Sequence, residues 1–167
     1  MASSSTPAPT YSAGTISSGE AAAEFEADIA PAVEPAGQVT KHTIRSPDGR
    51  DRTYRLYVPR SVPPERPVPL LIGLHGGTGW AEQFEENSGF DRLAESNQFI
   101  VAYPNGVGAV GTDALRTWNG GYCCGGAARN DVDDVGFIRL MVDEIERDHL
   151  IDVDRVYAAG HSNGGIM

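Results

Sequence analysis

Positive charge is scarce in this sequence and unevenly placed. The 167 residues include 13 Lys and Arg against 23 Asp and Glu, which gives a formal net charge of -10. The stretch from Met1 to Thr40 contains no Lys or Arg at all. Nucleic-acid binding requires clustered Lys and Arg to neutralise phosphates, and no such cluster is present. We therefore expect no nucleic acid among the partners.

Long hydrophobic runs are also missing. No segment approaches the roughly 18 apolar residues of a membrane helix, so we expect no membrane partner. The start, Met1 to Pro9, has neither the basic residues nor the apolar run of a secretory signal. Residues 1–38 are acidic and rich in Ala, Ser, Thr and Pro, with too few large apolar side chains to offset the entropy of ordering. We expect a disordered acidic tail there, followed by one folded domain over residues 39–167.

Cysteine is limited to the adjacent pair Cys123-Cys124. Neighbouring cysteines do not easily bridge to each other without distorting the peptide between them. We therefore expect free thiols, or a partner outside the chain. No residues have the spacing of zinc ligands, and we expect neither a metal nor a cofactor.

The hydrophobic pattern predicts an α/β fold. Alternating β-branched and aromatic residues, joined by Pro47-Asp48-Gly49, predict an N-terminal antiparallel hairpin. Continuous apolar runs predict buried strands, and helical spacing separates them. The order implies a mostly parallel sheet with right-handed crossovers. The predicted strands cover residues 39–45, 53–58, 70–74, 99–103 and 155–159, and the helices cover residues 84–97 and 134–149, the second capped by Asp133 or Asp134.

The last predicted strand leads directly into Gly160-His161-Ser162-Asn163-Gly164. This segment fits the Gly-x-Ser-x-Gly nucleophile elbow, a sharp strand-to-helix turn that exposes the serine hydroxyl. The pattern alone is weak in a glycine-rich chain, but the preceding strand and the helical turn that follows supply the expected context. Ser162 is therefore the candidate nucleophile.

A second loop offers donors for an oxyanion. His75-Gly76-Gly77 follows a predicted buried strand, where serine hydrolases of this kind place one arm of the oxyanion hole. We assign the hole to the backbone N–H of Asn163 and to that of Gly77 or Thr78. The catalytic acid and base follow the nucleophile in this fold, and only five residues follow Ser162, so we expect both outside this chain.

The other histidines and acids have simpler explanations. His42 lies on the predicted hairpin, His149 at a helix end and His75 in the oxyanion loop, while the side chain of His161 must leave the elbow in another direction than that of Ser162. Helix capping and solvation account for Asp131, Asp133 and Asp134.

Several motifs in one order resemble the polyhydroxybutyrate depolymerase-like and feruloyl esterase-like serine esterases. The resemblance runs from about Thr40 to the end of the chain. It rests on His75-Gly76-Gly77, Tyr103-Pro104-Asn105-Gly106, Trp118-Asn119, Cys123-Cys124-Gly125, Val132-Asp133-Asp134-Val135-Gly136-Phe137, Asp154-Arg155-Val156-Tyr157 and the elbow.

This resemblance implies an α/β-hydrolase fold, truncated after the nucleophile elbow, and a serine carboxylic-ester hydrolase that forms an acyl-enzyme on Ser162. The implied substrates are polyesters or feruloyl and acetyl esters of plant polysaccharides. Gly77 matches the oxyanion position, and Trp118 and Asn119 are possible substrate-site residues. Such enzymes are usually exported, which suggests an extracellular or periplasmic location despite the missing signal. The alternatives are a serine peptidase of the same fold and an inert fragment without acid and base; the oligomeric state stays open.

Overall fold

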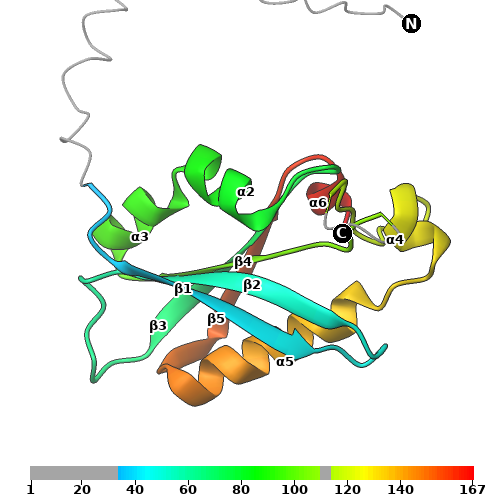
Figure 1. Cartoon of the computed structure of the whole chain (residues 1–167). Coiled ribbons are helices and arrows are strands. Elements are labelled where there is room, and N and C mark those ends of the chain that lie inside the picture. Colours follow the sequence, from blue (N-terminus) through cyan, green and yellow to red (C-terminus); the bar gives the residue numbers. More distant parts are fainter. Residues whose placement is uncertain (1–33, 110–113) are drawn as a thin grey trace, which may run out of the picture. The chain divides into compact units, whose positions relative to one another are not determined.

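A five-stranded sheet organises the folded domain (Figure 1). The computed structural model describes residues 34–109 and 114–167. The strand order is β1-β2-β4-β3-β5; β4, β3 and β5 are parallel, whereas β1 and β2 pair antiparallel. The α/β class and the antiparallel N-terminal hairpin are confirmed. The strands are β1 (Gln38–Arg45), β2 (Asp51–Val58), β3 (Val68–Leu74), β4 (Ile100–Pro104) and β5 (Ile151–Gly160).

Two short helices cover one face of the sheet, α2 (Ala81–Ser88) and α3 (Phe90–Asn97). They pack on a cluster that includes Tyr57, Val101 and Tyr103. The prediction of one helix over residues 84–97 was wrong, because Gly89 has φ 70° and breaks the chain into two helices. Glycine adopts this left-handed conformation without a steric penalty.

The opposite face is covered by α5 (Asp134–Asp148), drawn in orange in Figure 1. Phe137, Met141 and Ile145 lie one helical turn apart and pack on the sheet, each at most 1% exposed. Burying each such side chain contributes about 1.5–3 kcal/mol. Helix α6 (Asn163–Ile166) follows β5, and α4 (Gly125–Arg129) lies between β4 and α5, where the sequence pattern predicts no helix. Its small residues gave no apolar periodicity that would have revealed it.

The start of the domain lies slightly earlier than predicted. Residues 1–33, most of the predicted tail, lie outside the described residues. Ala36 N–H donates to Glu95 Oε1 at 3.2 Å and Gly37 N–H donates to the Tyr57 hydroxyl at 3.0 Å. The folded domain therefore includes at least Ala36, Gly37 and Gln38, three residues that the prediction assigns to the tail. Over the described ranges, none of the helices combines the length and apolarity needed to span a bilayer.

Candidate active site

The chain turns sharply at Ser162, between β5 and α6. Ser162 has φ 51° and ψ -116°, a conformation that costs a non-glycine residue on the order of 1–3 kcal/mol. The flanking glycines are sterically required: a Cβ on Gly160 would overlap the backbone of Gly164, and a Cβ on Gly164 would overlap the carbonyls of Leu74 and His75. The exposed Ser162 thus occupies a strand–turn–helix elbow.

The loop that follows β3 lies against this elbow. A Cβ added to Gly77 would lie 3.6 Å from Asn163 Cβ, an ordinary van der Waals contact. The N–H of Thr78 donates to the carbonyl of Arg116 at 2.7 Å. Within the described ranges, no acceptor is found for the N–H of Gly77 or of Asn163. The structure therefore brings together the predicted residues Ser162, Gly77 and Asn163. The N–H of the alternative donor, Thr78, is already engaged in a hydrogen bond.

The side chain of Asn163 is fixed by two hydrogen bonds to the backbone of Trp118. Trp118 N–H donates to Asn163 Oδ1 at 2.8 Å, and Asn163 Nδ2 donates to the Trp118 carbonyl at 3.1 Å. The indole Nε1 of Trp118 donates to the carbonyl of His75 at 2.9 Å. All three residues are buried. Trp118 therefore ties the residue after Ser162 to the loop that carries Gly77.

His75 is locked in a neutral form. Its Nδ1 is 2.7 Å from the Gly76 carbonyl, and its Nε2 accepts from the N–H of Gly106 at 2.9 Å. A carbonyl can only accept, so Nδ1 carries the single ring proton. Burial lowers the pKa of His75 to about 4. With both ring nitrogens engaged, His75 positions the loop and is unavailable as a base.

The remaining histidines are not placed to activate the serine. His42 stacks on Tyr54 with 4.6 Å between ring centroids, and His149 lies at the end of α5. His161 is exposed beside Ser162. In the part of the chain that the structure describes, no side chain is hydrogen-bonded to Ser162 Oγ.

A buried ion pair joins β2 to the start of α5. Arg52 Nη2 lies 2.5 Å from Asp134 Oδ1, and the two side chains are 3% and 0% exposed. The guanidinium also donates to the Asn105 carbonyl at 3.0 Å and lies 4.1 Å from the Phe137 ring centroid. Asp134 Oδ2 accepts from the N–H of Asn119 at 2.7 Å. No sequence pattern indicates the role of Arg52, because its partner Asp134 lies on a distant helix and local residues do not reveal such a pair.

The interpretation of Asp134 as a solvated or capping residue was wrong. Asp133 caps α5, since its side chain accepts from Gly136 N–H at 2.8 Å. Asp134, one position later, points to Arg52 and is 1% exposed.

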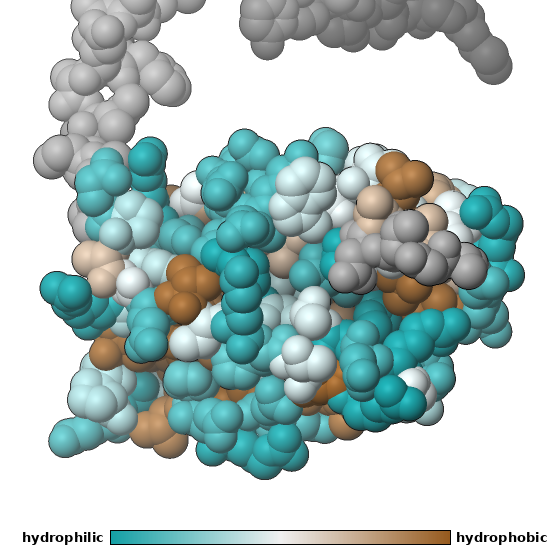
Figure 2. Space-filling model, in the orientation of Figure 1, coloured by the Kyte–Doolittle hydropathy of each residue, from teal (hydrophilic) through white to brown (hydrophobic). Residues whose placement is uncertain are grey.

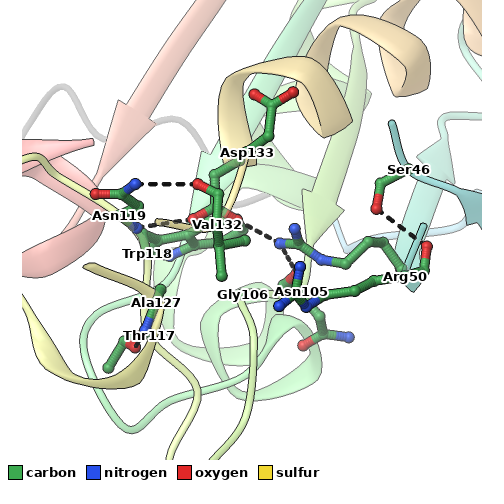
Figure 3. A network of polar contacts seen from close by, with 12 residues as sticks. Ser46, Arg50, Asn105, Gly106, Thr117, Trp118, Asn119, Ala127, Val132 and Asp133 are labelled. Carbon is green, nitrogen blue, oxygen red and sulfur yellow. Dashed lines mark hydrogen bonds and ion pairs between the residues drawn. The ribbon is translucent and has the colours of Figure 1, made fainter. Parts of the chain in front are cut away.

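Trp118 and Asn119 belong to a network of polar contacts behind the active-site loops (Figure 3). The side chain of Trp118 is fully buried, and its backbone is hydrogen-bonded to Asn163 of the elbow. Asn119 Nδ2 donates to the Val132 carbonyl at 3.1 Å, and Asn119 Oδ1 accepts from Gly121 N–H at 3.1 Å. These contacts give both residues structural roles, and direct contact with a substrate stays a prediction.

A cavity of about 440 Å³ opens beside the loop of residues 76–79. Gln83, Phe84 and Asn87 of α2 line it on one side, and His161 lines it next to Ser162. This loop cavity combines an aromatic ring with exposed amides, so it can accept a partly polar group attached to the reacting centre.

The cysteine pair differs from expectation. The structure joins Cys123 and Cys124 to each other in a disulfide, across a cis peptide bond. The prediction is free thiols or a partner outside the chain, because adjacent cysteines do not easily bridge to each other without distorting the peptide between them.

The sequence profile of the family described as "Esterase PHB depolymerase" matches residues 52–167. The chain belongs to this family. The match includes β2 to β5, the loop of residues 76–79 and the elbow, so the predicted family and the α/β-hydrolase fold are confirmed.

Individual relatives agree with this family. The chain is 38% identical over 104 residues to feruloyl esterase B of Piromyces equi, covering 62% of this chain and 18% of that protein. It is 32% identical over 111 residues to poly(3-hydroxyalkanoate) depolymerase C of Paucimonas lemoignei, covering 66% of this chain and 25% of that protein. Among solved structures, acetyl xylan esterase from Aspergillus awamori has the same fold, with a TM-score of 0.58 and 20% identity over 77% of this chain and 44% of that one. The chain thus spans less than half of each of these relatives.

Proposed function

We propose that this protein is a serine carboxylic-ester hydrolase of the PHB depolymerase esterase family, with Ser162 as its nucleophile. The observation that carries the proposal is the strained, exposed elbow at Ser162 beside two unengaged backbone N–H groups, those of Gly77 and Asn163. Acyl transfer needs this combination of a presented hydroxyl and preorganised donors for the developing negative charge.

The reaction follows from these groups. Ser162 Oγ bonds to the ester carbonyl carbon while its proton passes to a base, and the carbonyl oxygen, now negative, accepts from the N–H groups of Gly77 and Asn163. Collapse of this intermediate breaks the ester bond, and the departing alcohol takes the proton. Water then attacks the acyl-enzyme carbonyl while the base takes its proton. The acid product leaves, and Ser162 Oγ regains a proton from the base. No histidine of the sequence is placed as the base, so the proposal assigns it to a histidine outside these 167 residues, oriented by a carboxylate.

The proposed substrates are polyesters or feruloyl and acetyl esters of polysaccharides, in line with the names of the relatives. The loop cavity would hold the group next to the reacting carbonyl. The resemblance to exported esterases supports the proposal of an extracellular or periplasmic location. A serine peptidase is not favoured, because the matching family and both relatives are esterases or depolymerases.

A fluorophosphonate probe tests the nucleophile, because it reacts covalently with activated serines. We expect labelling of Ser162 in purified protein that includes the region carrying the proposed base, no labelling of residues 1–167 alone, and loss of the labelling in Ser162→Ala. Ser96→Ala is the matched control, since the Ser96 hydroxyl on α3 donates to the Arg92 carbonyl at 3.1 Å and lies outside the elbow. An unlabelled parent protein would support the inert alternative.

Parallel assays test the reaction class. We expect hydrolysis of p-nitrophenyl acetate and of methyl ferulate or a 3-hydroxybutyrate oligomer, and little cleavage of a peptide amide. Faster cleavage of the amide than of the esters would favour the peptidase.

A further inference from the structure

A second cavity lies on the α2 side of the β1–β2 hairpin, outside the elbow. Its volume is about 300 Å³. Lys41 and Thr43 of β1 pair in register with Arg55 and Thr53 of β2, and residues directly opposite in an antiparallel pair share one face. These four side chains form the floor of the cavity. We call it the hairpin groove and define it by the lining residues Lys41, Thr43, Thr53, Arg55, Trp80 and Asn105.

Trp80 forms the apolar wall of the hairpin groove. It precedes α2, and its side chain is 46% exposed, unlike the buried Trp118. Among the described residues, no aromatic ring or cation stacks on the Trp80 indole. An exposed indole surrounded by polar side chains can stack on a ligand that has one apolar face.

The polar groups around Trp80 are held in place before any ligand binds. Asn105 Oδ1 accepts from Ala81 N–H at 2.8 Å, and Asn105 Nδ2 donates to Thr53 Oγ1 at 3.0 Å. Arg55 is ion-paired with Glu82 at 3.1 Å and with Glu85. Side chains fixed in this way lose little entropy when a ligand binds.

Charge and polarity select the class of ligand. The charge of Arg55 is matched by Glu82 and Glu85, and the cations Lys41 and Arg116 also line the cavity. The floor of hydroxyl, amide and ammonium groups disfavours a purely apolar ligand. Figure 2 shows the molecule from the side on which β1 and β2 lie in front in Figure 1. This face is largely hydrophilic, with isolated hydrophobic residues. A ring with many hydroxyls and one apolar face can hydrogen-bond to these polar groups while it stacks on Trp80.

We propose that the hairpin groove is a saccharide-binding subsite that holds a sugar unit of a polysaccharide by stacking on Trp80. The groove adjoins the candidate active site, because Gly79 borders the loop cavity and the next residue, Trp80, borders the groove. Thr78 lines the loop cavity and Arg116 lines the hairpin groove. The hydrogen bond from Thr78 N–H to the Arg116 carbonyl therefore holds the two cavities next to each other. As a substrate subsite the groove rests on the proposed esterase function, and it narrows that function to esters carried on polysaccharides.

Calorimetric titration with xylohexaose, a neutral sugar hexamer, tests the subsite directly. We expect saturable binding with a Kd on the order of 1 mM and a change in Trp80 fluorescence. Trp80→Ala should weaken binding about tenfold or more, Trp80→Phe should retain part of it, and Thr43→Val should weaken it about threefold. Tyr157→Ala is the matched control, because Tyr157 is a 55% exposed aromatic on β5, outside the groove.

Two results would overturn the subsite: no saturable binding of xylohexaose, or equal binding by the parent and Trp80→Ala. Tighter binding of a 3-hydroxybutyrate hexamer, weakened by Trp80→Ala, would also overturn it in favour of a polyester groove. Hydrolysis of p-nitrophenyl acetate by the same parent preparation separates the two proposals. Hydrolysis without saccharide binding rejects the groove alone, whereas binding without hydrolysis or probe labelling rejects the esterase function.

Discussion

Asp134 and Glu95 are both buried carboxylates, but the fold stabilises them differently. Asp134, behind the active-site loops, faces the guanidinium of Arg52. Glu95 on α3 faces only neutral donors: its Oε1 accepts from the Tyr57 hydroxyl at 2.7 Å, from Arg60 N–H at 3.1 Å and from Ala36 N–H at 3.2 Å. Asp134 also holds the backbone of Asn119, next to Trp118, whereas Glu95 holds the start of the domain. The comparison indicates that one carboxylate shapes the site and the other only joins chain segments.

Asp134→Ala should produce the largest loss of stability. The variant leaves the charge of Arg52 buried without a partner, which costs about 3–5 kcal/mol. Urea denaturation measures this loss, and the rate of fluorophosphonate labelling at Ser162 should fall as well. Asp51→Asn is the control: the Arg45–Asp51 pair is 68% exposed on both sides, and its loss should change stability by less than about 1 kcal/mol. Unchanged labelling in a folded Asp134→Ala protein would contradict the role of Asp134 in the site.

Acid should destabilise the site through His75. The ordinary histidine pKa is 6.5, and burial lowers that of His75 to about 4. Between these values the unfolded chain binds more protons, so this contribution to stability falls as pH decreases, by about 3 kcal/mol in total. Burial raises the pKa of Asp91 to about 6, which acts in the opposite sense over part of this range. The comparison of parent and His75→Gln isolates the His75 contribution, and NMR should show His75 neutral down to about pH 4. A titration midpoint of His75 near pH 6.5 would contradict the lowered pKa of this residue.

Asn163→Ala should lower both stability and reactivity. It removes both hydrogen bonds to the Trp118 backbone, at a cost of about 1–3 kcal/mol, and frees the Asn163 N–H to move. We expect kcat for p-nitrophenyl acetate to fall about tenfold or more with little change in KM, because the donor acts mainly in the transition state. Asn163→Asp, which keeps the acceptor for Trp118 N–H, should recover part of kcat. Equal kcat in parent and Asn163→Ala would show that the bonds to Trp118 do not position the donor.

Glu95→Gln should have the smallest effect and spare the site. Burial raises the pKa of Glu95, but the hydrogen bonds from Tyr57 and the backbone outweigh burial and hold the pKa below its usual 4.5. Losing these charge-assisted bonds should cost about 1–2 kcal/mol at neutral pH. A carboxylate with a lowered pKa stabilises the fold above its ordinary pKa and loses this contribution as pH falls through its folded-state pKa, so parent and variant should converge in acid. Slower labelling of Ser162 in Glu95→Gln would break the contrast with Asp134.

Local patterns predicted the parts of the site that depend on neighbouring residues. The elbow could be found from Gly160, Ser162 and Gly164, because its steric demands lie within five positions. The choice between Gly77 and Thr78 could not be made, since it depends on the distant carbonyl of Arg116. The ion pair of Arg52 with Asp134 was hidden for the same reason, as was the buried position of Trp118. The break at Gly89 was local, but a single glycine within helical spacing does not distinguish a break from a tolerated helical residue.

Gly77 differs from the glycines of the elbow in why it lacks a side chain. Gly160 and Gly164 have none because neighbouring backbone fills the space, whereas a methyl group on Gly77 would make only an ordinary contact with Asn163. The backbone conformation of Gly77 is also open to other residues, since its φ is outside the left-handed region. The fold itself therefore tolerates alanine there, and an added methyl group would occupy space beside the proposed oxyanion donors. Position 77 is where a single added carbon would change which esters fit while the scaffold stays the same.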